Sequence, residues 1–448
     1  MSRPLYRQIY ERMREDILAG RLSHGDRLPS IRQMTRDSGV SRTTVETAYE
    51  QLCADGLVNC VPQSGYYVNQ LPRRRERVHT AEPQPQKPRY DFSGKYLDPT
   101  SFDFDIWRRL SRAVMQDSAS FLGYGDCQGE YELRRQIARY LSAGRGVYAS
   151  AENVVIGAGI QTLLSILCEM FDKSGRRIAF EDPGFQKGLR IFRDHNYEIV
   201  SVPGGASGID IRALYESGAN MLYISPSHSF PSGATLPLDK RLKLLEWAQS
   251  TGDGILFEDD YDGELRYTGK PLATLSSLDA NGQVIYLGTF SKLLPPSIRI
   301  SYAVLPDVLV PEYRCIAQRY NQTSSTMEQL TMARFIEEGR LEKQVRRLRR
   351  IYGRKNEAIT RALDRQFGAL ATVRPNDTGL HLNVSLRISE RADSLCARAE
   401  EHGLRIIPLS SYRTEGAESE TADLYLSCAG IAEKDIEPAI RLLRELCS

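Results

Sequence analysis

The 448-residue sequence has no apolar run of the ~18 residues that a membrane-spanning helix needs, and no apolar signal core follows Met1. Its eight cysteines are scattered and form no CxxC pair, so we expect neither a disulfide framework nor a metal site. Together these absences predict a cytoplasmic protein of a reducing compartment.

Neither sign of charge dominates, since 59 lysines and arginines stand against 57 aspartates and glutamates. The charge is nevertheless unevenly placed: residues 1–89 hold 15 basic and 10 acidic side chains, and the remainder is slightly acidic. A basic head on an acidic body hints at nucleic-acid contact. Hydrophobic residues make up 41% of the chain and charged residues 26%, which is typical of a globular protein, and the length predicts two or three domains.

The first ~70 residues carry the pattern of three helices and a hairpin. Apolar side chains repeat at four-residue spacing in a first helix, at Leu5, Ile9, Met13 and Ile17. Ser30 and Ser41 are expected to cap a second helix over residues 31–38 and a third that ends at Gly56. The third helix has an apolar face formed by Val45, Ala48, Tyr49 and Leu52. Residues 57–61 and 65–68 then predict a small β-hairpin.

This order of elements predicts a winged helix-turn-helix, in which the start of the third helix presents polar side chains to the major groove. The candidate DNA contacts lie on that helix, on the preceding turn and helix, and at the tip of the hairpin: Arg27, Ser30, Arg32, Ser41, Arg42, Thr43, Thr44 and Gly65. The alternative is a small three-helix bundle whose arginines are merely solvated.

The stretch GDRLPSIRQMTRDSGVSRTTVETAYEQLCADGLV, residues 25–58, closely resembles the GntR-type DNA-binding domain, and the resemblance covers roughly residues 3–70. It implies binding to double-stranded operator DNA. We therefore expect a DNA-binding domain over residues 1–70, a linker rich in arginine and proline over residues 71–90, and a large body over residues 91–448.

The body alternates strand-like apolar runs with helical patterns, which predicts an α/β fold with a mostly parallel sheet. The apolar runs are residues 153–156, 178–180, 221–224, 255–257 and 284–287. Polar residues follow each run, at the edge where open α/β sheets bind ligands.

These loops combine several groups that a pyridoxal phosphate pocket needs. Residues 157–159 lead into a helix N-terminus, an arrangement that binds phosphate through backbone N–H groups. Lys292 offers an amine directly after a buried strand, close in sequence to Arg299. Asp259 can hold a pyridinium nitrogen, and Tyr261 can face the phenolate oxygen of the cofactor.

The body also resembles fold-type I aminotransferases over roughly residues 90–446. Three segments carry the resemblance: YGDCQGEYELRRQIARYL at residues 124–141, where substrate enters, EDDYDGEL at 258–265, which meets the pyridine ring, and YLGTFSKLLPPSIRISY at 286–302, which holds the Schiff-base lysine. The resemblance implies that Lys292 forms the Schiff base with pyridoxal 5'-phosphate, that Asp259 pairs with the ring nitrogen and that Tyr261 reaches the ring oxygen. It further implies contacts with the ring or phosphate from Phe185, Ile160, Gln161, Thr289, Ser291 and Arg299. Asp260 remains an alternative to Asp259, because the two are adjacent.

A GntR-type head on such a body is the arrangement of the MocR/GabR family of transcriptional regulators, and the sequence is identified as a member. Tyr124 matches the tyrosine that aminotransferases donate to the phosphate site of the neighbouring subunit. The resemblance therefore implies a homodimer.

Two positions depart from the aminotransferase pattern. Phe230-Pro231-Ser232-Gly233 stands where those enzymes have Asn-Pro-x-Gly, so the asparagine at the ring oxygen is missing and His228 is expected to replace it, as in other chains of this kind. Tyr425 stands where they have the arginine that grips the substrate carboxylate. Arg405 and Arg413 are candidates to take over that role.

Three functions are compatible with these motifs: a regulator that binds the cofactor, a working aminotransferase with a DNA-binding head, and a regulator whose body only dimerises. The presence of Lys292, Asp259 and Arg299 argues against the third. Tyr425 argues against the second, since transamination needs a held carboxylate. We therefore expect a regulator with little or no transaminase activity, whose effector is the cofactor itself or an amino compound such as a GABA-like amino acid.

Overall fold

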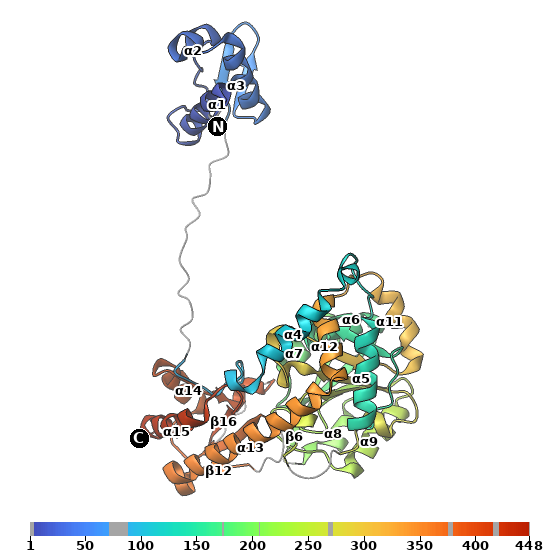
Figure 1. Cartoon of the computed structure of the whole chain (residues 1–448). Coiled ribbons are helices and arrows are strands. Elements are labelled where there is room, and N and C mark those ends of the chain that lie inside the picture. The colour runs from blue at the N-terminus through green and yellow to red at the C-terminus, as the bar shows by residue number, and fades with distance from the viewer. Residues whose placement is uncertain are drawn as a thin grey trace. The chain divides into compact units, whose positions relative to one another are not determined.

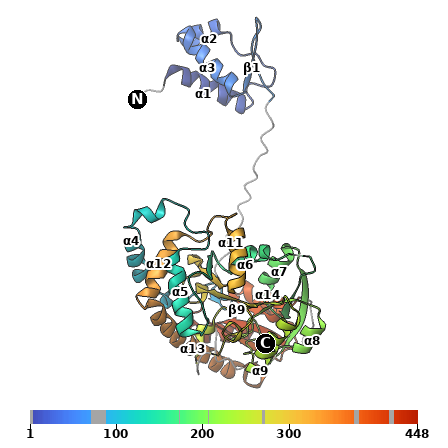
Figure 2. The same cartoon turned by 90° about the vertical axis from the view of Figure 1, so that its right-hand side faces the viewer.

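The computed structural model describes residues 4–70, 88–172, 174–205, 207–267, 272–374, 380–414 and 421–447 (Figures 1 and 2). The chain divides into two compact units, within residues 1–85 and 86–448. Most of the expected linker, residues 71–90, lies outside the described residues, and the domain boundaries stay predictions. None of the helices in the described ranges is long and apolar enough to cross a membrane.

The first unit has the predicted order of elements: α1 (Leu5–Leu18), α2 (Ile31–Ser38), α3 (Arg42–Ala54), and the antiparallel strands β1 (Val58–Val61) and β2 (Gly65–Val68). Both predicted N-caps are confirmed. The Ser30 hydroxyl accepts a hydrogen bond from the Gln33 N–H, and the Ser41 hydroxyl accepts one from the Thr44 N–H, each at 3.2 Å. The caps satisfy backbone donors that the first turn of a helix otherwise leaves free.

The core of this unit is the apolar face of α3, whose four predicted residues are fully buried. Ile9, Met13 and Ile17 of α1 pack in the same core. Leu5, the first residue of the four-residue repeat, does not join this face and is 57% exposed. A four-residue repeat drifts by about 40° per step on a helix of 3.6 residues per turn, and three steps carry Leu5 off the buried face.

An eight-stranded sheet forms the centre of the second unit, in the order β4-β11-β10-β9-β8-β5-β6-β7. Its strands are β4 (Val154–Gly157), β5 (Arg177–Asp182), β6 (Glu198–Gly205), β7 (Gly208–Ile209), β8 (Met221–Ile224), β9 (Ile255–Asp260), β10 (Val284–Thr289) and β11 (Ser301–Val304). The five strands from β10 to β6 run parallel, and only the pairs made by β11 and β7 are antiparallel. The predicted mostly parallel sheet is confirmed. Four of the five apolar runs lie wholly within its strands, and the run 153–156 begins one residue before β4.

Helices cover both faces of this sheet (Figures 1 and 2). Successive residues of β10, Ile285 and Tyr286, belong to different hydrophobic clusters, and both are fully buried. The helices of the unit are α4 (Phe104–Val114), α5 (Tyr131–Gly144), α6 (Ile160–Leu167), α7 (Gln186–Asp194), α8 (Ile211–Glu216), α9 (Leu238–Ser250), α10 (Leu275–Leu278), α11 (Val310–Ala317), α12 (Thr326–Glu337), α13 (Arg340–Phe367), α14 (Ala392–Glu401) and α15 (Ile436–Leu446). This two-sided burial explains why the strands are apolar throughout rather than alternating.

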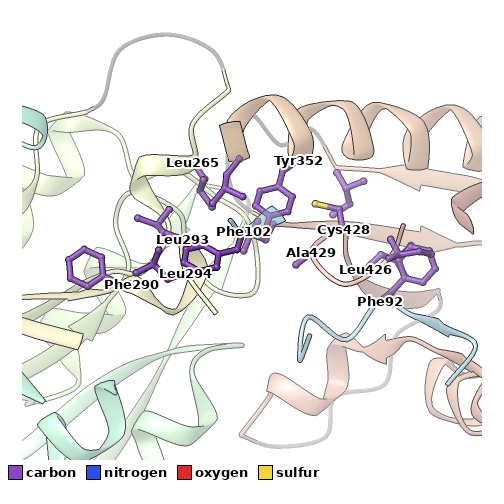
Figure 3. Close-up of a cluster of buried hydrophobic side chains, with 14 of the residues drawn as sticks. Phe92, Phe102, Leu265, Phe290, Leu293, Leu294, Tyr352, Leu426, Cys428 and Ala429 are labelled. Atoms are coloured by element: carbon purple, nitrogen blue, oxygen red, sulfur yellow. The ribbon is translucent and has the colours of Figure 1, made fainter. Parts of the chain in front are cut away.

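A second, antiparallel sheet follows α13 and was not predicted. Its order is β12 (Ala371–Val373), β13 (His381–Leu386), β16 (Ala422–Ser427) and β15 (Ile407–Pro408); the short strands β3 (Tyr90–Asp91) and β14 (Leu404–Arg405) pair beside it. Figure 3 shows buried side chains running from Phe290 and Leu293 past Tyr352 of α13 to Leu426 of β16. One hydrophobic cluster therefore joins the two sheets.

Candidate functional site

The candidate site lies where the carboxyl ends of β8, β9 and β10 meet. Ile224 of β8 pairs with Glu258 of β9, and Asp259 pairs with Leu287 of β10. The parallel register therefore brings the loops that begin at residues 225, 261 and 290 to one edge of the sheet. This is the edge at which open α/β sheets bind ligands.

Lys292 ends the short turn Phe290–Lys292 that follows β10. Phe290 and Leu293 flank it in the chain and are 2% and 1% exposed, so the turn is anchored in the core while Lys292 stays partly accessible. Burial is the largest influence on Lys292 and lowers the pKa of its amine, against the opposing charges of Asp262 and Asp259. A lowered pKa increases the neutral fraction of the amine, which is the form that attacks a carbonyl carbon.

The two adjacent aspartates of β9 point to opposite faces of the sheet, as successive strand residues do. Asp259 lies on the side of Lys292 and accepts a hydrogen bond from the Tyr223 hydroxyl at 2.6 Å. Burial raises the pKa of Asp259 to about 7. Asp260 is instead engaged by the Arg145 guanidinium, with Nε at 2.7 Å and Nη2 at 2.5 Å from its Oδ2.

His228 lies in the loop after β8 and is held by the residues that follow β9. Its Nδ1 is 2.8 Å from a carboxylate oxygen of Asp262 and 2.9 Å from the Tyr261 hydroxyl. Its Nε2 is buried, and no described residue hydrogen-bonds to it. The ring is stacked against His381, with the centroids 4.8 Å apart. Asp262 thus fixes the orientation of an imidazole that keeps one ring nitrogen for a ligand.

An anion-binding arrangement lies at the start of α6. Gly159 precedes the helix with φ 87°, and a Cβ there would lie 2.3 Å from the Arg299 guanidinium, so the close approach requires glycine. Arg299 donates to the Ala158 carbonyl at 3.0 Å. No side chain caps α6, so its first backbone N–H groups are available to an anion.

The other residues predicted to contact the ring or the phosphate lie at three places near the same strand ends. The Thr289 and Ser291 hydroxyls are 3.1 Å apart on the turn that carries Lys292. Ile160 packs beside the hydrophobic cluster and Gln161 has an exposed side chain, so at the start of α6 they offer their backbone N–H groups. Phe185 stands before α7, with its ring centroid 5.8 Å from that of Tyr223.

Tyr124 is not gathered with these residues. Its side chain is 81% exposed, and that of Leu122, two positions earlier in the chain, is 88% exposed. Large apolar side chains at such exposure are typical of a surface that another protein covers.

Aromatic side chains surround the position at which the sequence lacks an arginine. Tyr425 of β16 is stacked on His381 of β13 at 4.5 Å between centroids, and the rings of Tyr412 and Phe230 lie within 5.9 Å of it. Arg405 and Arg413 are the two candidates to replace the missing arginine. The Nη2 of Arg405 forms an ion pair with Oε1 of Glu400 at 2.6 Å. Arg413 directly follows Tyr412 in the chain.

Sequence reasoning assigned no role to four residues that shape the site: Arg145, Tyr223, Asp262 and His381. Arg145 is 115 positions from Asp260, and no local pattern links the two. Tyr223 lies inside an apolar run and His381 in a sheet that was not predicted. Of the four, only Asp262 could have been suspected from the sequence, because it belongs to the carboxylate cluster of residues 258–262.

The predicted DNA contacts of the first unit are mostly at its surface, with Ser30, Arg32, Ser41, Arg42 and Thr43 exposed and Thr44 half-buried. Arg42 forms an ion pair with Glu46 one turn along α3, at 2.8 Å. The backbone of Arg27 bridges to Tyr67 of β2, and a Cβ on Gly65 would lie 2.9 Å from the Arg27 guanidinium. The hairpin tip and the turn before α2 are therefore adjacent.

Two family models match the chain, and together they account for both units. Residues 5–68 match the model of bacterial regulatory proteins of the gntR family. Residues 93–443 match the model of aminotransferase class I and II.

Similar proteins share this arrangement over almost the whole length. The uncharacterized HTH-type transcriptional regulator YdeL of Bacillus subtilis is 37% identical, over 98% of this chain and 96% of its own. The probable rhizopine catabolism regulatory protein MocR of Rhizobium meliloti is 30% identical, over 98% and 93%. Among solved structures, a kynurenine aminotransferase of Pyrococcus horikoshii in complex with PMP matches 80% of this chain and 90% of its own, at 26% identity and a TM-score of 0.72.

Proposed function

The chain belongs to the MocR family of DNA-binding transcriptional regulators, which join a GntR-type domain to an aminotransferase class I and II domain, and we propose that its body senses a small molecule through bound pyridoxal phosphate. The observation that carries the proposal is the half-buried Lys292, whose amine lies within electrostatic reach of Asp259 at the strand ends of a body that is joined to a DNA-binding head.

Three features of the site fit this cofactor. Burial raises the pKa of Asp259 to about 7, and a protonated pyridine nitrogen would favour the ionised form of this carboxylate. The free start of α6 with Arg299 matches a phosphate dianion. The buried Nε2 of His228 has no partner among the described residues and suits a ring oxygen.

In this proposal each residue has a distinct task. Asp259 holds the pyridine nitrogen, while Tyr261 and His228 face the ring oxygen and Phe185 stacks on the ring. Phosphate contacts come from Arg299, from the Thr289 and Ser291 hydroxyls, and from the backbone at residues 160 and 161. The bound cofactor supplies an aldehyde that reacts reversibly with primary amines. Lys292 would supply the amine, whose lowered pKa increases its neutral fraction.

The effector is proposed to be the cofactor itself or an amino compound that competes with Lys292. Tyr425, enclosed by His381 and Phe230, offers no bidentate grip on a carboxylate. This supports a sensor rather than a working aminotransferase. Adding amino acids, with a keto acid present as amino acceptor, should therefore change the absorbance of the loaded protein without releasing the keto acid of the added amino acid. Release of that keto acid over many turnovers would favour the enzyme.

We also propose that the protein is a homodimer assembled through its body. Tyr124 and Leu122 give that body an exposed aromatic and apolar surface. By analogy with the aminotransferases, Tyr124 would complete the phosphate site of the other subunit. Two heads on one dimer then suit an operator with two half-sites.

The direct test is to trap the cofactor on its lysine. The protein is incubated with pyridoxal phosphate, reduced with borohydride and digested, and the labelled peptide is identified by mass spectrometry. We expect the label on Lys292, and Lys292→Ala should lose both the label and the absorbance of the bound cofactor. Lys187→Ala is the control, because Lys187 is a second lysine within electrostatic reach of Lys292. A label on another lysine refutes the assignment.

A further inference from the structure

The two positions at which the sequence departs from the aminotransferase pattern lie in contact. Phe230 stands in the loop after β8 and Tyr425 on β16, and their ring centroids are 5.9 Å apart. In the aminotransferases that the body resembles, an asparagine and an arginine stand at these positions. The chain therefore places two aromatic rings together where those enzymes have two polar groups.

Four aromatic rings gather around this contact. We call Phe230, His381, Tyr412 and Tyr425 the aromatic cluster. The Phe230 centroid lies 4.8 Å from that of Tyr412 and 6.0 Å from that of His381. His381 and Tyr425 are buried, whereas Phe230 and Tyr412 are only half-buried. The aromatic cluster therefore stays partly accessible to a ligand.

The aromatic cluster borders the residues proposed to hold the cofactor. The Phe230 ring lies 6.1 Å from that of Tyr261, and the Tyr261 hydroxyl is 2.9 Å from Nδ1 of His228. His381 lies within electrostatic reach of the Lys292 amine. A molecule that reacts at the position of Lys292 would therefore have the aromatic cluster beside it.

Tyr412 is anchored to the loop that carries Phe185. Its carbonyl accepts hydrogen bonds from the Gly184 N–H and from Nε2 of Gln186, each at 2.9 Å. Gly184 and Gln186 flank Phe185, which is proposed to stack on the cofactor ring. Arg413 directly follows Tyr412 and is the alternative source of a contact with a carboxylate.

The charges around the aromatic cluster disfavour an anion. Burial lowers the pKa of His381 well below its usual range, so its ring is neutral. Burial raises the pKa of Tyr425, and the negative charge of Asp262 raises it further. Oδ1 of Asp262 is buried without a hydrogen-bond partner among the described residues. A carboxylate against these rings would lose water, find no cation in the cluster and be repelled by Asp262.

We propose that the aromatic cluster binds the non-reacting part of the effector and selects primary amines that carry no carboxylate and have an aromatic or alkyl remainder. This inference rests on the proposed function, in which an amino compound competes with Lys292. The nitrogen of the amine takes the place of the Lys292 nitrogen on the aldehyde carbon. One carbon–nitrogen double bond forms, one breaks, and the hydrogens of the amine pass to Lys292. The rings offer the remainder apolar burial and aromatic pairing.

The test titrates the full-length protein, loaded with pyridoxal phosphate, with two matched pairs of compounds. Phenylethylamine is compared with phenylalanine, and n-butylamine with GABA, so that within each pair one member has a carboxylate and the other has none. The absorbance of the bound cofactor and the melting temperature both measure binding. Each ratio of affinities is divided by the same ratio for free pyridoxal phosphate, which removes differences in the reactivity of the amines.

We expect each amine to bind about 10- to 100-fold more tightly than its partner with a carboxylate, because the cluster gives a charged group no hydrogen bonds. Tyr425→Arg should reduce this preference at least about tenfold, by tightening the binding of phenylalanine. Tyr148→Arg is the control, because it adds the same charge at a tyrosine that is 94% exposed, and it should keep the preference. The wild-type comparison decides the question even if Tyr425→Arg does not fold.

Three results overturn the inference. The first is equal affinity within both pairs. The second is tighter binding of the compounds with a carboxylate, and if Arg413→Gln then abolished that binding, Arg413 would be the carboxylate contact. The third is no response to any of the four compounds, which would leave the cofactor itself as the effector. A protein without the absorbance of a bound cofactor before any amine is added would instead contradict the proposed function.

Discussion

Replacing Arg145 by methionine tests whether the buried ion pair between Arg145 and Asp260 supports the candidate site from the opposite face of the sheet. Arg145 and Asp260 are 3% and 1% exposed, and two guanidinium nitrogens approach the same carboxylate oxygen. The Tyr286 hydroxyl donates to that oxygen at 2.7 Å, and Arg145 also reaches the Ser227 hydroxyl at 3.1 Å. The pair thus ties the end of β9 to the loop that carries His228.

The expected cost follows from the burial of both partners. Removing one partner of a buried pair leaves an uncompensated charge and costs about 3–5 kcal/mol of unfolding free energy. With Arg145→Met, the hydrogen bond from Tyr286 is the one side-chain hydrogen bond that Asp260 keeps among the described residues. Asp260→Asn should also destabilise, because it weakens the partner of a buried guanidinium. The double variant should cost less than the sum of the two, by about 1–3 kcal/mol, since the two residues are in direct contact.

Urea unfolding followed by tryptophan fluorescence measures this cost. The protein has two tryptophans, Trp107 and Trp247, and both are buried in the body, so the signal does not report on the DNA-binding head. Arg212→Met is the control, because Arg212 and Glu216 form a pair whose side chains are 87% and 64% exposed. Such a surface pair is worth about 0.5 kcal/mol or less.

The same variants should also change the affinity of the candidate site for the cofactor. Asp260 adjoins Asp259, and Ser227 adjoins His228, so loosening the pair should weaken cofactor binding about tenfold, which is roughly 1.4 kcal/mol. A cost for Arg145→Met no larger than that for Arg212→Met would refute the reasoning. Strict additivity in the double variant would do so as well.

Arg42→Ala is expected to weaken operator binding by about 1–3 kcal/mol in an anisotropy titration, with unchanged cofactor absorbance, and normal binding would contradict the placement of α3 in the major groove. The cofactor-free protein should lose stability as pH rises from about 4 to 7. Burial raises the pKa of Glu258 and Asp259 to about 7, so in this pH range the folded state keeps protons that the unfolded state has released. Calorimetry of Asp259→Asn should show a weaker pH dependence, by about 1.4 kcal/mol per pH unit, and an unaltered one would contradict the raised pKa. Removing residues 1–72 should leave a dimer that binds the cofactor and not the operator, and a monomer with full cofactor affinity in ultracentrifugation would contradict the role proposed for Tyr124.

Local signals in the sequence were sufficient for the elements that depend on them. Ser30 and Ser41 cap their helices as expected, because a cap is decided within three residues. The central strands were recognisable since a strand covered on both faces is apolar throughout. The antiparallel sheet after α13 was missed, because polar residues interrupt its two main strands, β13 and β16, so neither is a continuous apolar run.

The sequence by itself determined the family, the order of the two units and the lysine on which the proposal depends. It left open whether Asp259 or Asp260 pairs with the ring nitrogen of the cofactor, because the two are adjacent, neighbouring strand residues point to opposite faces and one position of register exchanges them. Tertiary structure supports Asp259, since it lies on the side of Lys292 while Asp260 is paired with Arg145. It also enclosed Tyr425 among aromatic rings from three separate segments. Such contacts join residues far apart in the chain, and only packing brings their side chains together.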